Sequence, residues 1–184
     1  MPRLTTPRLV LRPLVRGDAR AVASHLGNWD VTRMLALPPW PYRQADAEHF
    51  VATLARRPAN DPAITLALTL PPDDEAIGVV DLAAAGARTV LGYWLAEPYW
   101  GKGLMTEALA ALFAHAFSVR PLDTISSGVF HDNPASLAVQ KKLGFVVTGE
   151  SVVHCVPRDL LVRHIDTALT RAAFAAATAE SATR

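Results

Sequence analysis

The sequence is poor in residues that form covalent cross-links or cysteine-based metal sites. Its 184 residues include one cysteine, Cys155, and only three lysines among 18 basic residues. A single cysteine excludes an internal disulfide bond and a zinc site built on cysteines, so we expect no metal. Acidic residues number 17, which leaves a formal net charge of +1. A charge this small argues against a dedicated nucleic-acid-binding protein.

Long apolar runs are also missing. The longest stretch without Asp, Glu, Lys or Arg is 108–119, whereas a membrane span needs about 20 residues. Arg3, Arg8 and Arg12 precede any apolar run, which is not the pattern of a secretory signal. We therefore expect a soluble, cytoplasmic protein that has no membrane partner.

The apolar content is nevertheless sufficient for one folded domain. Hydrophobic residues make up 51% of the chain and charged residues 19%, which excludes a disordered protein. A chain of this length suits a single domain, which we place at residues 1–169. Residues 170–184 are small, polar and rich in alanine, and we expect a flexible tail there.

Hydrophobic periodicity predicts an α+β fold with a mixed central sheet of about seven strands and four helices. A helix between strands 89–95 and 123–130 predicts that these two run parallel, whereas short links predict an antiparallel meander before them. Strands are predicted near 9–14, 63–70, 76–82, 89–95, 123–130, 145–156 and 161–169. Helices are predicted after Asp18, at 44–56, at 104–119, and from Asn133 to Gly144.

The most specific feature is the segment Tyr99–Thr106, which joins a predicted strand to the longest predicted helix. Gly101 and Gly103 allow a tight turn and a close approach of the backbone to a bound group. The first N–H groups of the helix point into the same space and make a cradle for phosphate or diphosphate. The glycine spacing fits neither the P-loop nor the dinucleotide fingerprint. A plain strand-to-helix turn is the alternative, and Lys102 is the candidate for a phosphate contact.

Several short motifs occur in a fixed order along the chain. They are Thr6–Arg12, Leu91–Leu95, Tyr99–Gly103, Thr106–Leu109, Asn133–Ser136 and Lys142–Phe145. In this order and spacing they resemble the GNAT superfamily of acetyltransferases, over roughly residues 5–169. The branch that they resemble most is the RimJ/RimL group of ribosomal-protein N-terminal acetyltransferases and their relatives.

The resemblance implies a GNAT-like fold, acetyl-CoA as the acyl donor, and a primary amine as the acceptor, either a protein N-terminus or a small amine. It places the diphosphate of the donor on the backbone of Gly101–Thr106 and pairs the pantetheine arm with the strand that carries Tyr93–Leu95. Asn133 is expected near the pantetheine, although an N-cap before Pro134 also explains this residue. The implied donor-binding residues are Trp94, Leu95, Trp100, Gly101, Lys102, Gly103, Leu104, Met105, Thr106, Asn133 and Ser136.

Three positions depart from the family pattern. Pro98 stands where the loop usually begins with Gln or Arg, and Val90 stands where the pantetheine strand often carries Glu. Gln140 stands where many members have a tyrosine that protonates the thiolate. Two hypotheses therefore stay open: an acetyl-CoA-dependent N-acetyltransferase, or a catalytically weak GNAT-like module that binds CoA or a related ligand.

For catalysis, the resemblance implies direct attack of a neutral amine on the thioester. A backbone N–H of the Tyr93–Leu95 strand would stabilise the oxyanion. Ser136 is the candidate proton donor to the departing thiolate, the alternative being a serine that only satisfies local backbone groups. His131 is the candidate base closest to the motifs. The other candidate bases are Asp81, Glu97 and Asp132.

The acceptor class depends on how easily its amine loses a proton. An α-amine titrates near 7.7–8.0 and lysine near 10.4, so the lack of an obvious catalytic carboxylate favours N-terminal or amino-acid acceptors. The loop from Trp29 to Tyr42 is rich in Trp and Pro, and we expect Trp29, Trp40 and Tyr42 to form the acceptor wall. The alternative is a loop whose tryptophans cover the core. Many relatives pair, so a homodimer also stays open.

Overall fold

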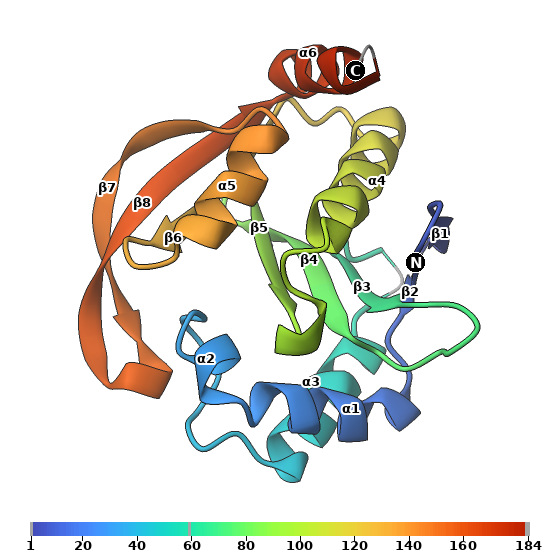
Figure 1. Cartoon of the computed structure of the whole chain (residues 1–184), viewed down its shortest axis with the longest axis vertical. Coiled ribbons are helices and arrows are strands. Elements are labelled where there is room, and N and C mark those ends of the chain that lie inside the picture. Colours follow the sequence, from blue (N-terminus) through green and yellow to red (C-terminus); the bar gives the residue numbers. More distant parts are fainter. Residues whose placement is uncertain (1, 59, 183–184) are drawn as a thin grey trace.

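The computed structural model describes residues 2–58 and 60–182, and Figure 1 shows their arrangement. Eight strands form one sheet in the order β1-β2-β3-β4-β5-β6-β8-β7. They are β1 (Leu4–Thr5), β2 (Val10–Pro13), β3 (Ile64–Thr69), β4 (Gly78–Ala85), β5 (Arg88–Leu95), β6 (Thr124–Phe130), β7 (Val146–Cys155) and β8 (Leu160–Thr170). Strands β5 and β6 run parallel, and the other neighbouring pairs are antiparallel. The predicted mixed sheet with one parallel step is therefore confirmed.

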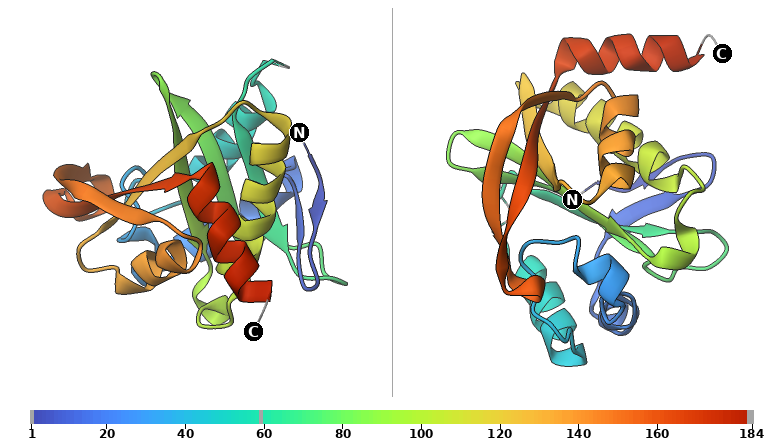
Figure 2. Two further views of the ribbon diagram at one scale, coloured as in Figure 1. Left: turned by 90° about the horizontal axis from the view of Figure 1, so that it is seen from above. Right: turned by 60° about the vertical axis from the view of Figure 1, so that its left-hand side comes forward.

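Helices cover both faces of the sheet (Figures 1 and 2). They are α1 (Ala19–Leu26), α2 (Trp29–Thr32), α3 (Gln44–Ala55), α4 (Leu104–Val119), α5 (Pro134–Lys142) and α6 (Arg171–Ala182), with 3-10 turns η1 (Arg16–Asp18), η2 (Glu97–Tyr99) and η3 (Val156–Arg158). Helices α4 and α5 lie on one face, and α1 and α3 lie on the other. No described helix is both long and apolar enough to cross a membrane.

The two faces of the sheet carry separate apolar cores. On the α4 face, Leu109, Leu112 and Phe113 of α4 are fully buried against the strands. On the α3 face, the smaller core of α1 and α3 is contacted by Trp94 of β5. Because side chains alternate along a strand, Tyr93 lies on the α4 face, where it packs against the main core.

The structure has more elements than the sequence predicts, eight strands and six helices in the described residues instead of about seven and four. Strand β1 spans two residues and pairs with β2 in a hairpin, which is too short to produce an alternation signal. Helix α2 is a single turn inside the segment expected to be a loop. The side chain of its N-cap Asn28 accepts a hydrogen bond from the Asp30 N–H (2.9 Å), and this cap stabilises the turn.

The segment expected to be a flexible tail is helix α6 up to Ala182. Its anchor is Phe174, which is 8% exposed and joins the main core. The Phe174 and Phe113 rings meet edge to face with centroids 5.8 Å apart. Alanine favours helix formation, and one buried aromatic ring then holds the helix on the domain. Composition alone does not show that the ring has a partner.

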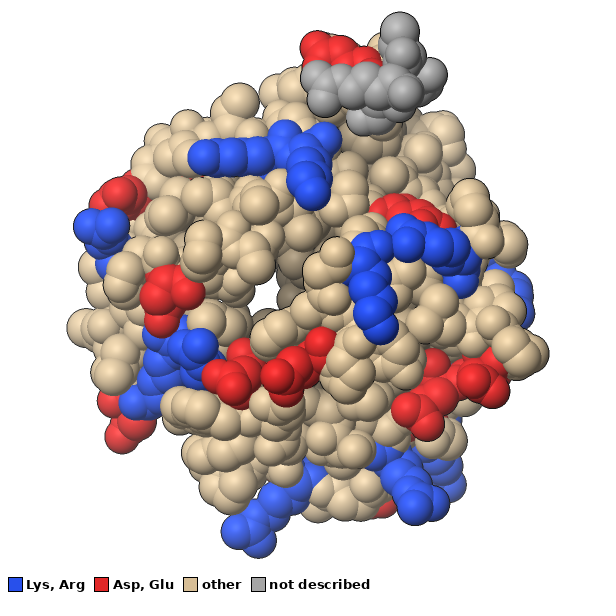
Figure 3. Space-filling view, viewed as in Figure 1, with Lys and Arg blue, Asp and Glu red and all other residues tan. Residues whose placement is uncertain are grey.

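Strands β5 and β6 pair only at their beginnings. The last paired residues are Val90 and Ser126, although β5 continues to Leu95 and β6 to Phe130. The two strands therefore diverge, and the edge of β5 beyond Val90 has no neighbouring strand among the described residues. Figure 3 shows an opening at this point near the centre of the molecule, viewed from the same side as Figure 1.

Candidate active site

Backbone N–H groups of β5 face the opening between β5 and β6. Ala96 directly follows β5, and its N–H points toward β4, because it donates to the carbonyl of Ile77 next to β4 (2.9 Å). Successive N–H groups of a strand point to opposite sides, so those of Tyr93 and Leu95 face the opening and that of Trp94 faces β4. Two donors are thereby available to pair with an extended ligand or to stabilise an oxyanion.

Helix α4 begins a few residues after β5, and its first N–H groups have no side-chain cap. Gly103 is the N-cap residue with φ of 74°, and Gly101 has φ of 72°. Glycine adopts these left-handed values without steric cost. The N–H groups of residues 104–106 are therefore free to bind an anion, and the exposed Lys102 lies in the same loop. The tight turn that Gly101 and Gly103 predict is present before α4, and the diphosphate site stays a prediction.

A second basic residue reaches this loop from the start of the chain. Arg8 donates to the Lys102 carbonyl (2.8 Å) and forms an ion pair with Glu107 of α4 (2.6 Å). Glu107 also accepts a hydrogen bond from the Thr6 hydroxyl (2.6 Å). Burial acts to raise the pKa of Glu107, but the hydrogen bonds from Thr6 and Arg8 outweigh it and hold this pKa below its ordinary value. Arg8 is not among the residues predicted for the site, and its only signal in the sequence is the motif Thr6–Arg12.

Two predicted catalytic residues meet at the opening. The Tyr93 hydroxyl on β5 lies 2.6 Å from the Ser136 hydroxyl in the first turn of α5. Burial raises the pKa of Tyr93 above its ordinary value, although its hydrogen bonds with Ser136 and Gln140 act in the opposite direction. The phenol therefore stays protonated at neutral pH. The sequence suggested only the backbone of Tyr93, whereas the structure adds its side chain to the site.

Residues around this pair fix its position. The Asn133 side chain accepts a hydrogen bond from the Ser136 N–H (3.0 Å), which confirms its role as the N-cap of α5. Gln140 is fully buried, donates to the Ser127 hydroxyl on β6 (3.0 Å) and accepts from the Thr167 hydroxyl on β8 (2.7 Å). At the position where the resemblance suggests a tyrosine, this chain has an amide that joins α5 to β6 and β8.

Two of the carboxylates considered as bases are engaged by neighbours. Asp81 on β4 accepts a hydrogen bond from the Thr65 hydroxyl and lies 3.7 Å from the Arg57 guanidinium. Glu97 in η2 accepts a hydrogen bond from the Asn28 side chain (2.5 Å). The described contacts of these two carboxylates include neither Tyr93 nor Ser136.

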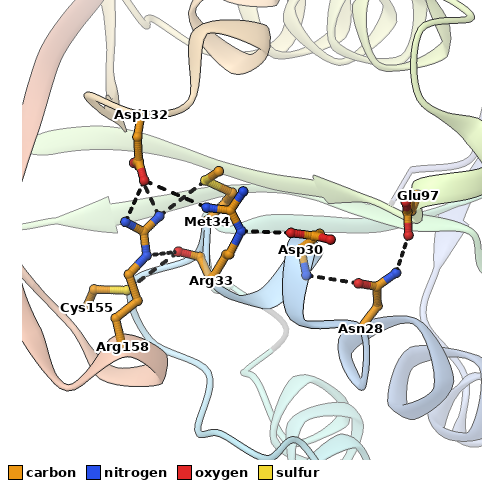
Figure 4. A network of polar contacts seen from close by, with 8 residues as sticks. All are labelled: Asn28, Asp30, Arg33, Met34, Glu97, Asp132, Cys155 and Arg158. Atoms are coloured by element: carbon orange, nitrogen blue, oxygen red, sulfur yellow. Dashed lines mark hydrogen bonds and ion pairs between the residues drawn. The ribbon is translucent and has the colours of Figure 1, made fainter.

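The third carboxylate, Asp132, belongs to a network that joins the β7–β8 turn to the segment after α2 (Figure 4). Asp132 accepts a hydrogen bond from Arg158 in η3 (2.8 Å), and Arg158 also donates to the Arg33 carbonyl (2.5 Å). Burial acts to raise the pKa of Asp132, but the Arg158 hydrogen bond and charge lower it overall. Cys155 is fully buried, with its Sγ 3.4 Å from the Leu35 carbonyl. The network is structural, and the thiol is not placed to act as a nucleophile.

His131, the predicted base, lies in the turn after β6. His131 is exposed. Its backbone N–H donates to the Arg163 carbonyl (3.0 Å), and its ring Nδ1 lies 3.3 Å from the same oxygen. The described contacts of His131 include neither Tyr93 nor Ser136. The structure therefore does not join His131 to the other two predicted catalytic residues.

The aromatic residues expected at the acceptor wall separate into two groups. The Trp29 and Trp40 rings contact each other with centroids 4.8 Å apart, and their side chains are 39% and 40% exposed. Tyr42 packs against the core of α1 and α3, and burial together with the charge of Asp46 raises its pKa to about 12. Of these three residues, only the tryptophan pair offers an accessible surface, and its Trp29 is the first residue of α2.

The site therefore combines an open strand edge, an uncapped helix N-terminus and a hydroxyl pair. Such an arrangement can hold an extended, amide-containing arm on β5 and a diphosphate at α4. Within residues 2–58 and 60–182, no three or more His, Cys, Asp or Glu side chains are grouped to hold a metal ion.

Comparisons with known proteins agree with this geometry. Residues 8–146 match the family described as acetyltransferase (GNAT) domain. The chain is 29% identical over 151 residues to the uncharacterised N-acetyltransferase YoaA of Bacillus subtilis, covering 80% of this chain and 85% of that protein. It is 32% identical over 80 residues to the ribosomal-protein-serine acetyltransferase of Escherichia coli, covering 42% and 45% of the two chains. The structure of RimJ from Mycobacterium smegmatis with CoA-disulfide superposes with a TM-score of 0.78 at 22% identity, covering 93% and 87%.

Proposed function

Because the chain belongs to the GNAT family of N-acetyltransferases, we propose that it moves an acetyl group from acetyl-CoA to a primary amine by direct attack of the amine on the thioester. The observation that carries this proposal is the divergence of β5 and β6 beyond Val90 and Ser126. It leaves the N–H groups of Tyr93 and Leu95 without a strand partner at the point where the reaction would occur.

The donor would bind along β5 and α4. The free N–H groups of Tyr93 and Leu95 suit the amide groups of a pantetheine arm, which would add to β5 like a further strand. The uncapped N–H groups of residues 104–106 and the Lys102 ammonium suit its diphosphate. Arg8 supports this site, because it holds the loop through the Lys102 carbonyl and holds α4 through Glu107. The RimJ structure with CoA-disulfide supports CoA as the ligand.

The hydroxyl pair would act on the leaving group. As the C–S bond breaks, negative charge develops on sulfur, and hydrogen bonds placed in advance stabilise such charge. Tyr93 and Ser136 share a hydrogen bond at the opening, so one hydroxyl donates to the other and the second can donate to sulfur. A thiol is already acidic, with a reference pKa near 8.5, so two weak donors are sufficient for this step.

We propose an α-amine as the acceptor, on a protein N-terminus or a small molecule. An α-amine ionises about 2.5 pH units below a lysine side chain, so more of it is neutral at pH 7. The similarity to the ribosomal-protein-serine acetyltransferase of Escherichia coli supports this class. The exposed rings of Trp29 and Trp40 would form one side of its binding surface.

The test is a thiol-release assay on the purified protein with acetyl-CoA and two matched peptides. One peptide has a free N-terminus and no lysine, and the other has an acetylated N-terminus and one lysine. We expect faster thiol release with the first, and mass spectrometry should locate the acetyl group on its α-nitrogen. Binding of acetyl-CoA in calorimetry without transfer to either peptide would instead favour a module that only holds CoA. Preference for the lysine peptide would overturn the α-amine assignment.

A further inference from the structure

Three polar side chains on the β7–β8 hairpin form a second cluster, apart from the hydroxyl pair. His164 Nδ1 lies 2.8 Å from Oδ1 of Asp166, and the Ser151 hydroxyl donates to the same oxygen over 2.8 Å. His164 and Asp166 are two residues apart on β8, and Ser151 pairs with His164 across the ladder. All three therefore project from the same face of the sheet. Their side chains are partly buried, His164 being 20% exposed.

The cluster determines which imidazole nitrogen is free. Burial acts to raise the pKa of Asp166, but the hydrogen bonds from His164 and Ser151 and the charge of Arg88 hold it below its ordinary value. Asp166 is therefore an ionised carboxylate that only accepts hydrogen bonds. The Nδ1 atom must then carry a hydrogen, so the lone pair of a neutral ring lies on Nε2. No side chain or backbone group of the described residues forms a hydrogen bond with His164 Nε2.

The ring lies against β6 where that strand begins to diverge from β5. A Cβ atom on Gly128 would collide with Cε1 of His164 and lie 2.7 Å from the Ile165 carbonyl oxygen, so the imidazole occupies the space above this glycine. Gly128 is two residues beyond Ser126, the last residue of β6 that pairs with β5. The Phe130 and His164 rings also meet edge to face, with centroids 5.8 Å apart.

The imidazole and the hydroxyl pair lie on opposite faces of the sheet. Ser127 contacts Gln140 of α5 (3.0 Å), so the neighbouring Gly128 and the ring above it face away from α5. On this second face, a Cβ atom on Gly92 of β5 or on Gly149 of β7 would meet nothing within 4 Å. These two glycines therefore leave this face uncovered at their positions on β5 and β7.

We propose that His164 is the general base that removes a proton from the acceptor amine, with Asp166 as the residue that positions it. This inference rests on the proposed function. The amine nitrogen forms a bond to the acetyl carbon, the C–S bond breaks with its electron pair on sulfur, and the amine proton passes to Nε2. Sulfur is protonated from solvent through the Tyr93 and Ser136 hydroxyls, and His164 returns its proton to solvent.

The experiment measures kcat/KM against pH for the wild type and His164→Asn. Asparagine can keep the hydrogen bond to Asp166 but has no atom at the position of Nε2. We expect kcat/KM for the amine to fall by about 10²- to 10⁴-fold, with acetyl-CoA affinity in calorimetry unchanged. With an acceptor of low basicity, the wild-type rate should fall on acidification as the general base becomes protonated, and the variant should lose this pH dependence.

Two further variants separate a base from a structural histidine. In Asp166→Asn the amide can donate a hydrogen bond to Nδ1 and so favour the tautomer that carries its hydrogen on Nε2. We expect a lower kcat/KM for the amine and an altered pH profile. The fold and the affinity for acetyl-CoA should be retained. His154→Asn is the matched control, because His154 is also a histidine beside a carboxylate, 3.6 Å from Asp159, but faces the other side of the hairpin. It should match the wild type. Asp166 is the charged group in contact with the imidazole; the charge of Arg88 acts on Asp166, and Arg158 lies over the Phe130 ring (5.0 Å).

The outcomes distinguish the two proposals. If the wild type acetylates amines and His164→Asn retains both the rate and the pH dependence, His164 is not the base while the proposed function stands. If the wild type binds acetyl-CoA and acetylates no amine, the proposed function fails and this inference fails with it. Circular dichroism and thermal unfolding of each variant check that a rate loss does not come from unfolding.

Discussion

The hydroxyl oxygens of Tyr93 and Ser136 lie 2.6 Å apart, although 43 residues separate them in the chain. Tyr93 comes from β5 and Ser136 from the first turn of α5, so their contact bridges the two sides of the opening beside the diverging strands. The resemblance places a proton-donating tyrosine at the position of Gln140, and we propose that the Tyr93 phenol on the facing strand takes this role. This pair is the basis of our first prediction.

Tyr93→Phe and Ser136→Ala should each lower kcat by about 10²-fold, because each removes one hydroxyl from a shared proton-donating pair. The KM for acetyl-CoA should change little. Since the two groups act as one unit, the double variant should be no slower than the slower single variant. Steady-state kinetics of the four proteins measures this coupling, and fully additive losses would show that the hydroxyls act independently.

Gly103→Val should weaken acetyl-CoA binding by at least tenfold. A β-branched residue at φ of 74° costs about 1–2 kcal/mol of backbone strain, and relief of this strain would turn the first N–H groups of α4 away from the diphosphate. The matched control is Gly86→Val in the β4–β5 turn, where φ is 61° and a Cβ atom meets nothing within 4 Å. It has the same type of strain away from the loop. Calorimetric titration should show weak binding in the first variant and normal binding in the second.

Glu107 should make stability depend on pH. Its pKa lies below the ordinary value in the folded protein, so the native state holds its proton less readily than the unfolded state. The resulting stabilisation is present above the unfolded pKa, about 4.3, and is lost as the pH falls through the folded pKa. Urea unfolding between pH 7 and pH 3 should show a smaller decrease in stability for Glu107→Gln than for the wild type. Parallel curves would contradict the effect of Thr6 and Arg8 on this carboxylate.

Gly128→Ala should destabilise the fold by about 1–3 kcal/mol, since the new Cβ atom has no room beside His164 and the Ile165 carbonyl. Gly149→Ala changes the same residue type on the outer strand β7, where a Cβ atom meets nothing within 4 Å. This control should remain within about 0.5 kcal/mol of the wild type. Denaturant midpoints of the two variants make the comparison, and equal midpoints would show that the imidazole does not occupy the space above Gly128.

The parts of the fold that the sequence predicted depend on short-range patterns. The helix 104–119 has its predicted bounds because a glycine precedes a long run of helix-forming apolar residues. Asn133 caps α5, as a polar residue before Pro134 predicts. The parallel step from β5 to β6 follows from the helix between them. Residues 171–182 form helix α6 instead of the expected flexible tail, because its packing depends on Phe174 meeting a distant core.

Only the part of the candidate site that lies in one continuous segment could be predicted from the sequence, because the rest depends on contacts between residues far apart in the chain. The glycine loop is one continuous segment, and its conformation follows from Gly101 and Gly103 themselves. By contrast, the contact of Arg8 with Glu107 spans 99 residues, and the stacking of His164 above Gly128 depends on β8 lying between β6 and β7. Nothing near these residues in the sequence shows what will lie beside them.

By itself, the sequence determined the mixed sheet, the glycine turn and the family, because glycine conformation, helix capping and side-chain periodicity act within a few residues. Only the tertiary structure decided which groups that are distant in the chain come into contact: Tyr93 with Ser136, Arg8 with the glycine loop, and His164 with Gly128. The physical reason is that hydrogen bonds act over about 3 Å. The order of the strands and the point at which β5 leaves β6 set which groups come within that distance.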